Sequence, residues 1–198
     1  MPLIKLNNRS IKDVTSFPFA VGNLVHIQSQ TASNSASISF TTGINSTYKE
    51  YQFYFIDVHP RTDQAELNFQ GSADGGSNYG VAITSTSFRA FHDEADTLTG
   101  LGYQTGADLA QSTAFQTLTN GIGNGADETT VGTLQLFNPS STTYVKHFIG
   151  RCNGYQGANF SIEVNTAGYF NTTSAINAIQ FKFDTGNFDG TIALFGVV

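Results

Sequence analysis

Charged residues are scarce in this chain of 198 residues, of which only 12% are Asp, Glu, Lys or Arg. Nine Lys and Arg against fifteen Asp and Glu give a formal net charge of −6. The chain has no basic stripe that would neutralise phosphates, so nucleic acid is not an expected partner. Uncharged polar residues lose hydration more cheaply than ions when two proteins meet. This composition favours a chain assembled into something larger, although many β-rich domains simply carry Thr and Ser on exposed strand faces.

Trp is absent and cysteine nearly so. Cys152 is the only cysteine, which excludes an intrachain disulfide and a thiolate metal cage, and we expect it to be a small buried residue. No apolar run approaches the roughly 20 residues that cross a bilayer. The opening MPLIKLNNRS lacks the long apolar core of a secretory signal. We therefore expect no membrane partner and synthesis in a cytoplasm.

The chain does have aromatic residues, with 17 Phe and 8 Tyr, which supply the large buried surfaces of a globular domain. Apolar and polar residues alternate from residue 160 to 165 and again from 179 to 184, and a period of two predicts half-buried strands. We predict an all-β fold, an antiparallel, jelly-roll-like β-sandwich of about ten strands, formed by residues 19–198 as a single domain. Residues 1–18 are predicted to form an extended N-terminal arm.

For two of the predicted strands, the sequence also indicates which faces are covered and which strands pair. The run from Tyr51 to Val58 is apolar at both odd and even positions, which predicts a central strand covered on both faces. Residues 65–70 alternate, with Leu67 and Phe69 expected inward and Gln70 outward, and we expect the two runs to form an antiparallel pair. Between residues 89 and 130 the pattern weakens; a short helix at 107–111 and a strand near 115–122 are predicted there.

The densest group of ionisable residues is His92, Asp93, Glu94 and Asp96, which is interpreted as a solvated acidic loop rather than a metal or acid-base site. The Gly-rich residues 71–80 contain no Lys, and no helix is expected after them, so phosphate binding is not predicted. Residues 184–190 are interpreted as a hairpin turn, and residues 124–128 as another turn, rather than calcium sites. We predict no catalytic residue, no cofactor and no metal ligand.

Several segments resemble a group of β-rich virion proteins encoded by tailed bacteriophages of marine bacteria, including cyanobacteria. The segments are STYKEYQFYFIDVHPRTD, ITSTSFRAFHDE, LFNPSSTTYVKHFIGR and AGYFNTTSAINAIQFKFDTGNFDGTIALFG, and the opening LIKLNNRSIKD is also similar. The resemblance spans nearly the whole chain and implies a structural component of the virion. It brings no catalytic residues with it.

We therefore expect a capsid decoration or cement protein, located in the virion as a small homo-oligomer such as a trimer. Its partners would be the major capsid protein or other virion proteins, and it would stabilise contacts between shell subunits. The residues expected to contact the partner are Leu3, Ile4, Leu6 and Ile11 in the arm, with Phe91 and Tyr103 in the irregular region.

Two alternatives remain open. In a tail-fibre or receptor-binding module that recognises a bacterial surface glycan, Tyr79, His92 and Tyr103 would stack on sugar rings. In a polysaccharide depolymerase, acids such as Asp93 or Glu94 would converge in a cleft. The absence of Trp and of shaft repeats argues against both.

Overall fold

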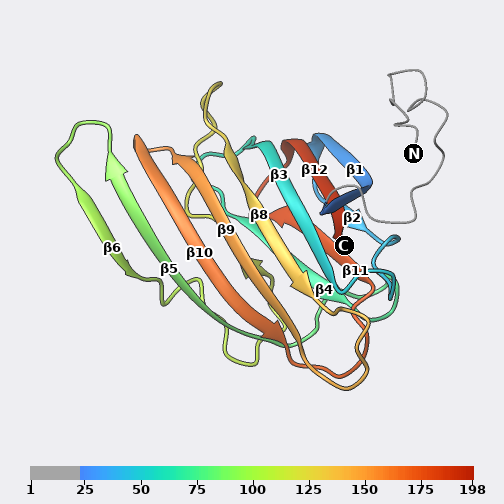
Figure 1. The fold of residues 1–198 in the computed structure, drawn as a ribbon. Helices are drawn as coiled ribbons and strands as arrows, with labels where there is room; N and C mark the ends of the chain where they lie inside the picture. Colours follow the sequence, from blue (N-terminus) through green and yellow to red (C-terminus); the bar gives the residue numbers. More distant parts are fainter. Residues whose placement is uncertain (1–22) are drawn as a thin grey trace, which may run out of the picture.

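The computed structural model describes residues 23–198, which fold into two antiparallel β-sheets (Figure 1). The eight-stranded sheet has the order β1 (Leu24–Ser35), β12 (Phe188–Val197), β3 (Glu50–Pro60), β8 (Thr130–Phe137), β9 (Lys146–Gln156), β10 (Phe160–Phe170), β5 (Ile83–Asp93) and β6 (Thr99–Tyr103). The four-stranded sheet has the order β2 (Ile38–Phe40), β11 (Ala178–Phe183), β4 (Leu67–Ser72) and β7 (Gln116–Thr117).

The predicted all-β sandwich is confirmed, and no helix occurs between residues 23 and 198. The same residues contain twelve strands rather than about ten. The larger sheet lies in front of the smaller one in the view of Figure 1. We call the side of the larger sheet that faces the smaller one its inner face, and the opposite side its outer face.

Aromatic side chains fill the space between the two sheets. Phe181 of β11 is fully buried, and its ring lies 5.1 Å from that of Phe53 and 5.2 Å from that of Phe55, both of β3. Phe40 of β2 and Phe69 of β4 also contact Phe181, and their ring centroids lie 6.1 and 6.4 Å from that of Phe181. Most of these contacts are edge-to-face, an arrangement that adds to the free energy gained by burial alone. Phe181 therefore joins strands of both sheets. Cys152 is buried in the same core, as expected.

The outer face of the larger sheet is not covered by any described residue layer, which corrects the prediction for the run from Tyr51 to Val58. That run forms most of β3, which is central in its sheet. Its inward residues Tyr51, Phe53 and Phe55 are buried, but Tyr54 is only half-buried and Ile56 is exposed. The apolar character of the second side therefore reflects an open sheet face rather than a second core.

The smaller sheet differs at β4, where the outward side is covered. All six residues of β4 are buried, although Gln70 was predicted to face solvent. The Gln70 side-chain amide donates to the carbonyl oxygens of Thr113 and Ala114, at 3.1 and 2.8 Å. These residues belong to the segment that follows β6, where residues 107–111 form turns and irregular chain, so the predicted helix is wrong. The strand predicted near 115–122 is reduced to β7.

Two predictions about connections are also wrong. β3 pairs with β12 and β8, whereas β4 pairs with β11 and β7, so residues 51–58 and 65–70 lie in different sheets and do not form a hairpin. Residues 184–187 likewise lead from β11 in the smaller sheet to β12 in the larger one. Local alternation cannot distinguish a hairpin from a crossover between layers. Within residues 23–198 there is also no helix of the length and apolar character needed to span a membrane.

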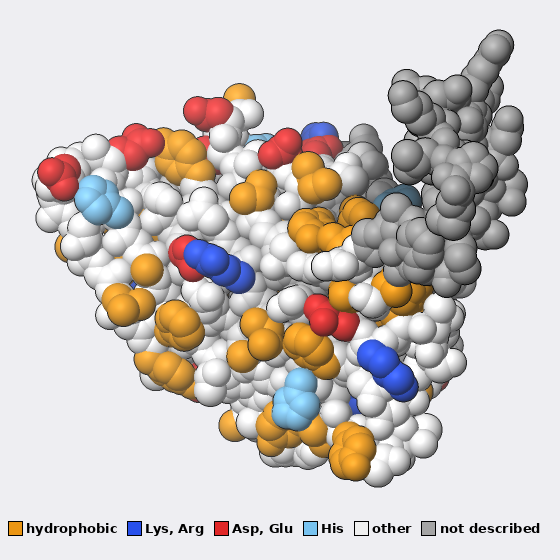
Figure 2. All heavy atoms as spheres, in the orientation of Figure 1, with side chains coloured by type: hydrophobic (Ala, Val, Ile, Leu, Met, Phe, Trp, Pro, Cys, Tyr) orange, Lys and Arg blue, Asp and Glu red, His pale blue; other side chains and the backbone are white. Residues whose placement is uncertain are grey.

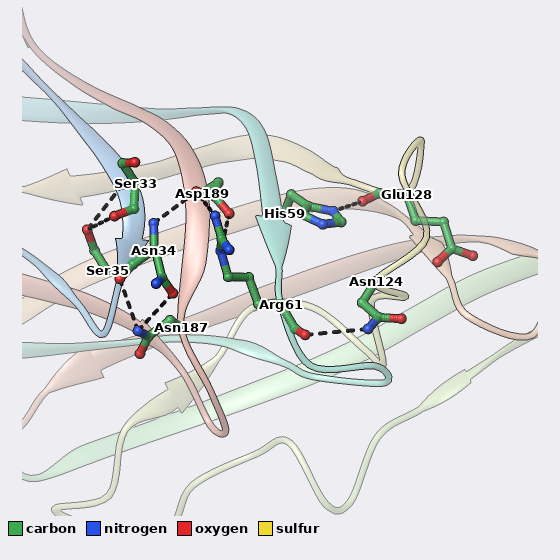
Figure 3. A network of polar contacts seen from close by, with 9 residues as sticks. All are labelled: Ser33, Asn34, Ser35, His59, Arg61, Asn124, Glu128, Asn187 and Asp189. Atoms are coloured by element: carbon green, nitrogen blue, oxygen red, sulfur yellow. Dashed lines mark hydrogen bonds and ion pairs between the residues drawn. The ribbon is translucent and has the colours of Figure 1, made fainter.

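One end of the larger sheet is joined by a polar network (Figure 3). Arg61, just after β3, donates to both carboxylate oxygens of Asp189 in β12, at 2.7 and 3.0 Å. Asp189 also accepts the backbone N–H of Asn34 in β1, at 2.9 Å. The Asn187 side chain donates to the backbone and side-chain oxygens of Asn34. Three neighbouring strands are thereby tied together where β12 begins.

We expect Asp189→Asn to lower the stability of the protein at pH 7. The hydrogen bonds from Arg61 and from the backbone of Asn34 lower the pKa of Asp189 below its usual range. A carboxylate whose pKa is lowered by folding stabilises the protein at pH values above its unfolded pKa of about 4. This stabilisation is lost as the pH falls through the lower pKa of the folded state. Urea midpoints should therefore differ between wild type and variant at pH 7 and converge by about pH 2. Asp127→Asn, in an exposed loop, is the control; an equal difference at both pH values would contradict the prediction.

Candidate functional site

The outer face is a broad surface with little net charge. Its central residues come from the five strands β3, β8, β9, β10 and β5, and cross-strand pairing places them side by side. They are Gln52, Tyr54, Ile56, Val131, Thr133, Gln135, Ile149, Arg151, Asn153, Glu163, Asn165, Ala167, Phe88 and Ala90. Figure 2 shows this side, with apolar side chains spread among uncharged polar ones and few charged groups.

Apolar side chains on this face are exposed to an unusual degree. Ile56, Phe88, Val131 and Ile149 each keep between 41 and 49% of their accessible surface. The central charges, Arg151 and Glu163, neutralise each other through two hydrogen bonds of 2.7 and 3.0 Å. The bond from Arg151 also lowers the pKa of Glu163, which therefore stays ionised and paired. Such a face can be dehydrated without isolating a charge.

The outer face is large enough to form a stable protein interface. Eight strands spaced at about 4.8 Å, with side chains extending over about nine residues of about 3.3 Å each, give roughly 1,000 Å². A stable interface buries about 800 Å² on each partner. A sheet face of this size, with exposed apolar side chains and its central charges paired, is typical of surfaces that bind other proteins.

A second surface lies on the inner face, beyond the edge of the smaller sheet. β7 reaches β5 and β10 through a 2.5 Å bond from Ser85 to Gln116 and a longer one from Thr166 to the Thr117 carbonyl. Further along β5, Arg89 and Phe91 have no strand opposite them and instead line two adjoining cavities of about 180 and 310 Å³. Arg89 and Asn120 line both cavities. We call these two adjoining cavities together the inner cleft.

The acidic group at residues 92–96 forms a turn between β5 and β6 that the Asp93 side chain holds together. Asp93 accepts the backbone N–H groups of Thr97 and Leu98, each at 2.8 Å, and the Thr97 hydroxyl. These bonds lower the pKa of Asp93. A carboxylate with its oxygens so occupied fits a capping role and not that of a proton donor. His92, exposed, contacts the exposed Asp96.

Beside this turn, an open cavity of about 360 Å³ is lined by His92, Glu94 and Tyr155. A hydrogen bond with Glu94 raises the pKa of the Tyr155 hydroxyl. The nearby acids would repel an anionic ligand. Among residues 23–198, no group of three or more His, Cys, Asp or Glu is arranged to hold a metal ion.

The Gly-rich loop at residues 71–80 is closed by its own polar groups. Asp74 accepts the Ser72 hydroxyl and both the backbone and side-chain N–H groups of Asn78, which lowers its pKa to about 2. Tyr79 packs its hydroxyl end against Gly76 and is half-buried. A ring held in this way does not present a free face to a sugar.

The structure does not bring the three residues of the glycan hypothesis together. Tyr79 precedes the first residue of β5 and His92 is its penultimate residue, which separates them by about 30 Å or more. Phe91 and Tyr103, which are expected to contact a protein partner, each line one of the two cavities of the inner cleft. The arm residues Leu3, Ile4, Leu6 and Ile11 lie outside the described residues.

Comparison with protein-family models and with curated proteins gave no match to this chain. The candidate surfaces therefore rest on geometry. Sequence reasoning missed Ile149 as an exposed apolar residue, since period two does not say which face is open. It also missed the hydrogen-bonded group of Glu66, Arg89 and Asn120. These residues come from three distant segments, and no local sequence pattern indicates that they lie together.

Proposed function

We propose that this protein is a structural component of a phage virion, a decoration or cement protein that stabilises contacts between shell subunits. The observation that carries the proposal is the outer face, where exposed apolar side chains lie among uncharged polar groups and the central charges are already paired. The low charge of the whole chain and the resemblance of its segments to virion proteins point the same way.

In this proposal the outer face lies across a junction between shell subunits. A decoration protein that binds only the assembled arrangement raises the free energy needed to separate its neighbours, because separation also breaks its own contacts. Burial of apolar side chains supplies affinity, and the amide and hydroxyl groups around them supply hydrogen bonds at the rim. The proposed partners are the major capsid protein or another virion protein, and the proposed state is a homotrimer.

Ile149→Lys is expected to weaken attachment to the particle by at least about 10-fold. Ile149 lies near the middle of the outer face and is 49% exposed, so Ile149→Lys should fold normally but place an unpaired charge inside the interface, where burial is costly. Leu98→Lys is the matched control, because Leu98 is 52% exposed but lines the inner cleft. Particles assembled without the protein would be mixed with each variant and sedimented, and bound protein would be quantified.

Attachment of wild type and of Leu98→Lys, with at least a 10-fold loss for Ile149→Lys, is the expected result. Equal attachment of both variants would reject the outer face as the contact. A wild-type protein that fails to attach at all would reject the decoration role. Sedimentation of the free protein as a monomer at high concentration would remove the trimer from the proposal.

We propose no enzymatic role. The carboxylate of Asp93 is occupied by its own turn, and Glu94 is exposed beside it, so neither supports the depolymerase alternative. The receptor-binding alternative is not supported by its original residues, because Tyr79 precedes β5 whereas His92 lies near the far end of that strand.

A further inference from the structure

The inner cleft combines an apolar wall with a polar one. The apolar wall consists of Phe91 of β5, Phe160 at the start of β10, and Leu98 from the turn before β6. The rings of Phe91 and Phe160 meet edge-to-face at 5.8 Å, so each holds the other in place. Both rings are only partly buried. The cleft therefore offers an ordered aromatic surface to a ligand.

The polar wall is a chain of three planar groups. The Arg89 guanidinium donates to the side-chain oxygen of Asn120, and the Asn120 amide donates to the Glu66 carboxylate at 3.2 Å. Arg89 also lies over the Phe91 ring, 5.4 Å from its centre, so the polar chain begins directly against the apolar wall. Guanidinium, amide and carboxylate groups together offer several donors and acceptors beyond the bonds they make to each other.

The charges in this wall compensate one another. Arg89 and Glu66 carry opposite charges on either side of a neutral amide. Burial and the neighbouring Asp184 raise the pKa of Glu66, whereas Arg89 and Asn120 act in the opposite direction. Neither an anion nor a cation is favoured strongly by such a balanced pair. A neutral ligand with many hydroxyl groups suits the wall better than a phosphate or an amine.

A further acceptor at the same wall has no partner. The side-chain oxygen of Gln104, which lines the cleft next to Tyr103, is buried and makes no hydrogen bond. Most buried polar atoms in folded proteins are hydrogen-bonded, and an exception calls for a specific reason. A hydroxyl donor brought in by a ligand would satisfy this oxygen after a small rotation of the side chain.

We propose that the inner cleft binds a neutral saccharide, with the C–H face of a pyranose ring against the apolar wall and its hydroxyl groups hydrogen-bonded to Arg89, Asn120 and Glu66. Aromatic rings accept the apolar face of a sugar, and planar polar side chains read the positions of its hydroxyls. The two cavities, of about 180 and 310 Å³, would accommodate a short stretch of an oligosaccharide. This site differs from the earlier combination of Tyr79, His92 and Tyr103, of which only Tyr103 lines it.

The inference goes beyond the decoration role and does not depend on it. The inner cleft and the outer face lie on opposite sides of the larger sheet, so attachment through one leaves the other accessible. A decoration protein with such a site would carry a saccharide-binding activity on the surface of the particle.

Binding of the full chain to an array of neutral oligosaccharides of glucose, mannose and galactose tests the proposal. Sialylated, uronic-acid and phosphorylated oligosaccharides of equal length serve as charged comparisons. The tightest neutral probe would then be titrated by calorimetry into wild type, Phe91→Ala, Asn120→Ala and Leu98→Lys. Tyr144→Ala, which removes an exposed ring outside the cleft, is the matched control.

We expect at least one neutral oligosaccharide to bind, each cleft variant to weaken it by about 10-fold or more, and Tyr144→Ala to leave its Kd within about 2-fold. Absence of neutral binders, binding confined to charged probes, or unchanged affinity in the cleft variants would each overturn the proposal. If Phe91→Ala fails to fold, the exposed Leu98→Lys decides the question. The particle-attachment assay separates the two proposals, since the cleft variants should attach like wild type.

Discussion

Phe181→Ala is expected to lower the free energy of unfolding by about 3–5 kcal/mol, which is the usual loss for truncating a fully buried Phe. Phe181 has no exposed surface, and its ring contacts those of Phe40, Phe53, Phe55 and Phe69. The truncation leaves a cavity between two sheets whose strands are fixed by their own hydrogen bonds, so the surrounding rings cannot close it completely.

Equilibrium urea unfolding, followed by far-UV circular dichroism, measures this loss. Phe88→Ala is the control, because it removes the same ring from a half-exposed position on the outer face and should change stability by less than about 1 kcal/mol. Since a single domain has a stability of only about 5–15 kcal/mol, the Phe181 variant would lie close to the unfolding threshold. A loss of less than about 1 kcal/mol for Phe181→Ala would mean that the two sheets slide together to fill the space.

The parts of the fold that the sequence predicted correctly are those encoded locally. Ile162 and Val164 are buried while Ser161 is exposed, as period two requires. The residues of β11 follow the same rule, with Ile179 and Phe181 buried. The class of fold follows from repeating this pattern along the chain, because strands with one apolar side must cover one another in layers.

The pairing of strands and the covering of their faces could not be predicted, because both depend on residues far away in the chain. β3 is bounded by β12 and β8, strands that begin 128 and 70 residues after its last residue, Pro60. Gln70 is buried because a segment more than 40 residues away supplies two carbonyl acceptors. A polar residue at an outward position gives no sign of such a cover.

The candidate sites could not be predicted for the same reason, since they depend on residues far apart in the chain. The inner cleft exists because the larger sheet extends beyond β7, the edge strand of the smaller sheet. No strand of the smaller sheet therefore covers Phe91 and Arg89. In the sequence, both residues fall in the region of weak pattern after residue 88, and Phe91 is expected to contact a protein partner there. The outer face is likewise defined by what does not cover it. Unequal sheets therefore give this protein two accessible surfaces of different shape, a broad outer face of mixed apolar and polar side chains and a narrow inner cleft with an apolar and a polar wall.

Gly190→Ala is expected to lower the free energy of unfolding by about 2–4 kcal/mol, combining backbone strain with overpacking. Gly190 has a φ of +121°, and a Cβ atom there would lie 2.6 Å from the Asp57 carbonyl oxygen and 2.7 Å from the Val58 Cα. Both are backbone atoms that cannot rotate away. The β12–β3 register shifts between Asp189 and Thr191, opposite Asp57, whose own φ is +48°. The irregularities in the two strands therefore fit each other.

Gly75→Ala separates the two contributions. Gly75 also has a positive φ, of +74°, but a Cβ atom there would meet nothing within 4 Å, so its loss should be only about 1 kcal/mol. The φ of Gly190 lies further from the left-handed region that other residues reach, which adds to the contrast. In thermal unfolding, equal shifts of Tm for the two variants would mean that β3 moves aside and that close approach does not require glycine at 190. A larger shift for Gly190→Ala would show that the close approach of the β3 backbone requires glycine at position 190.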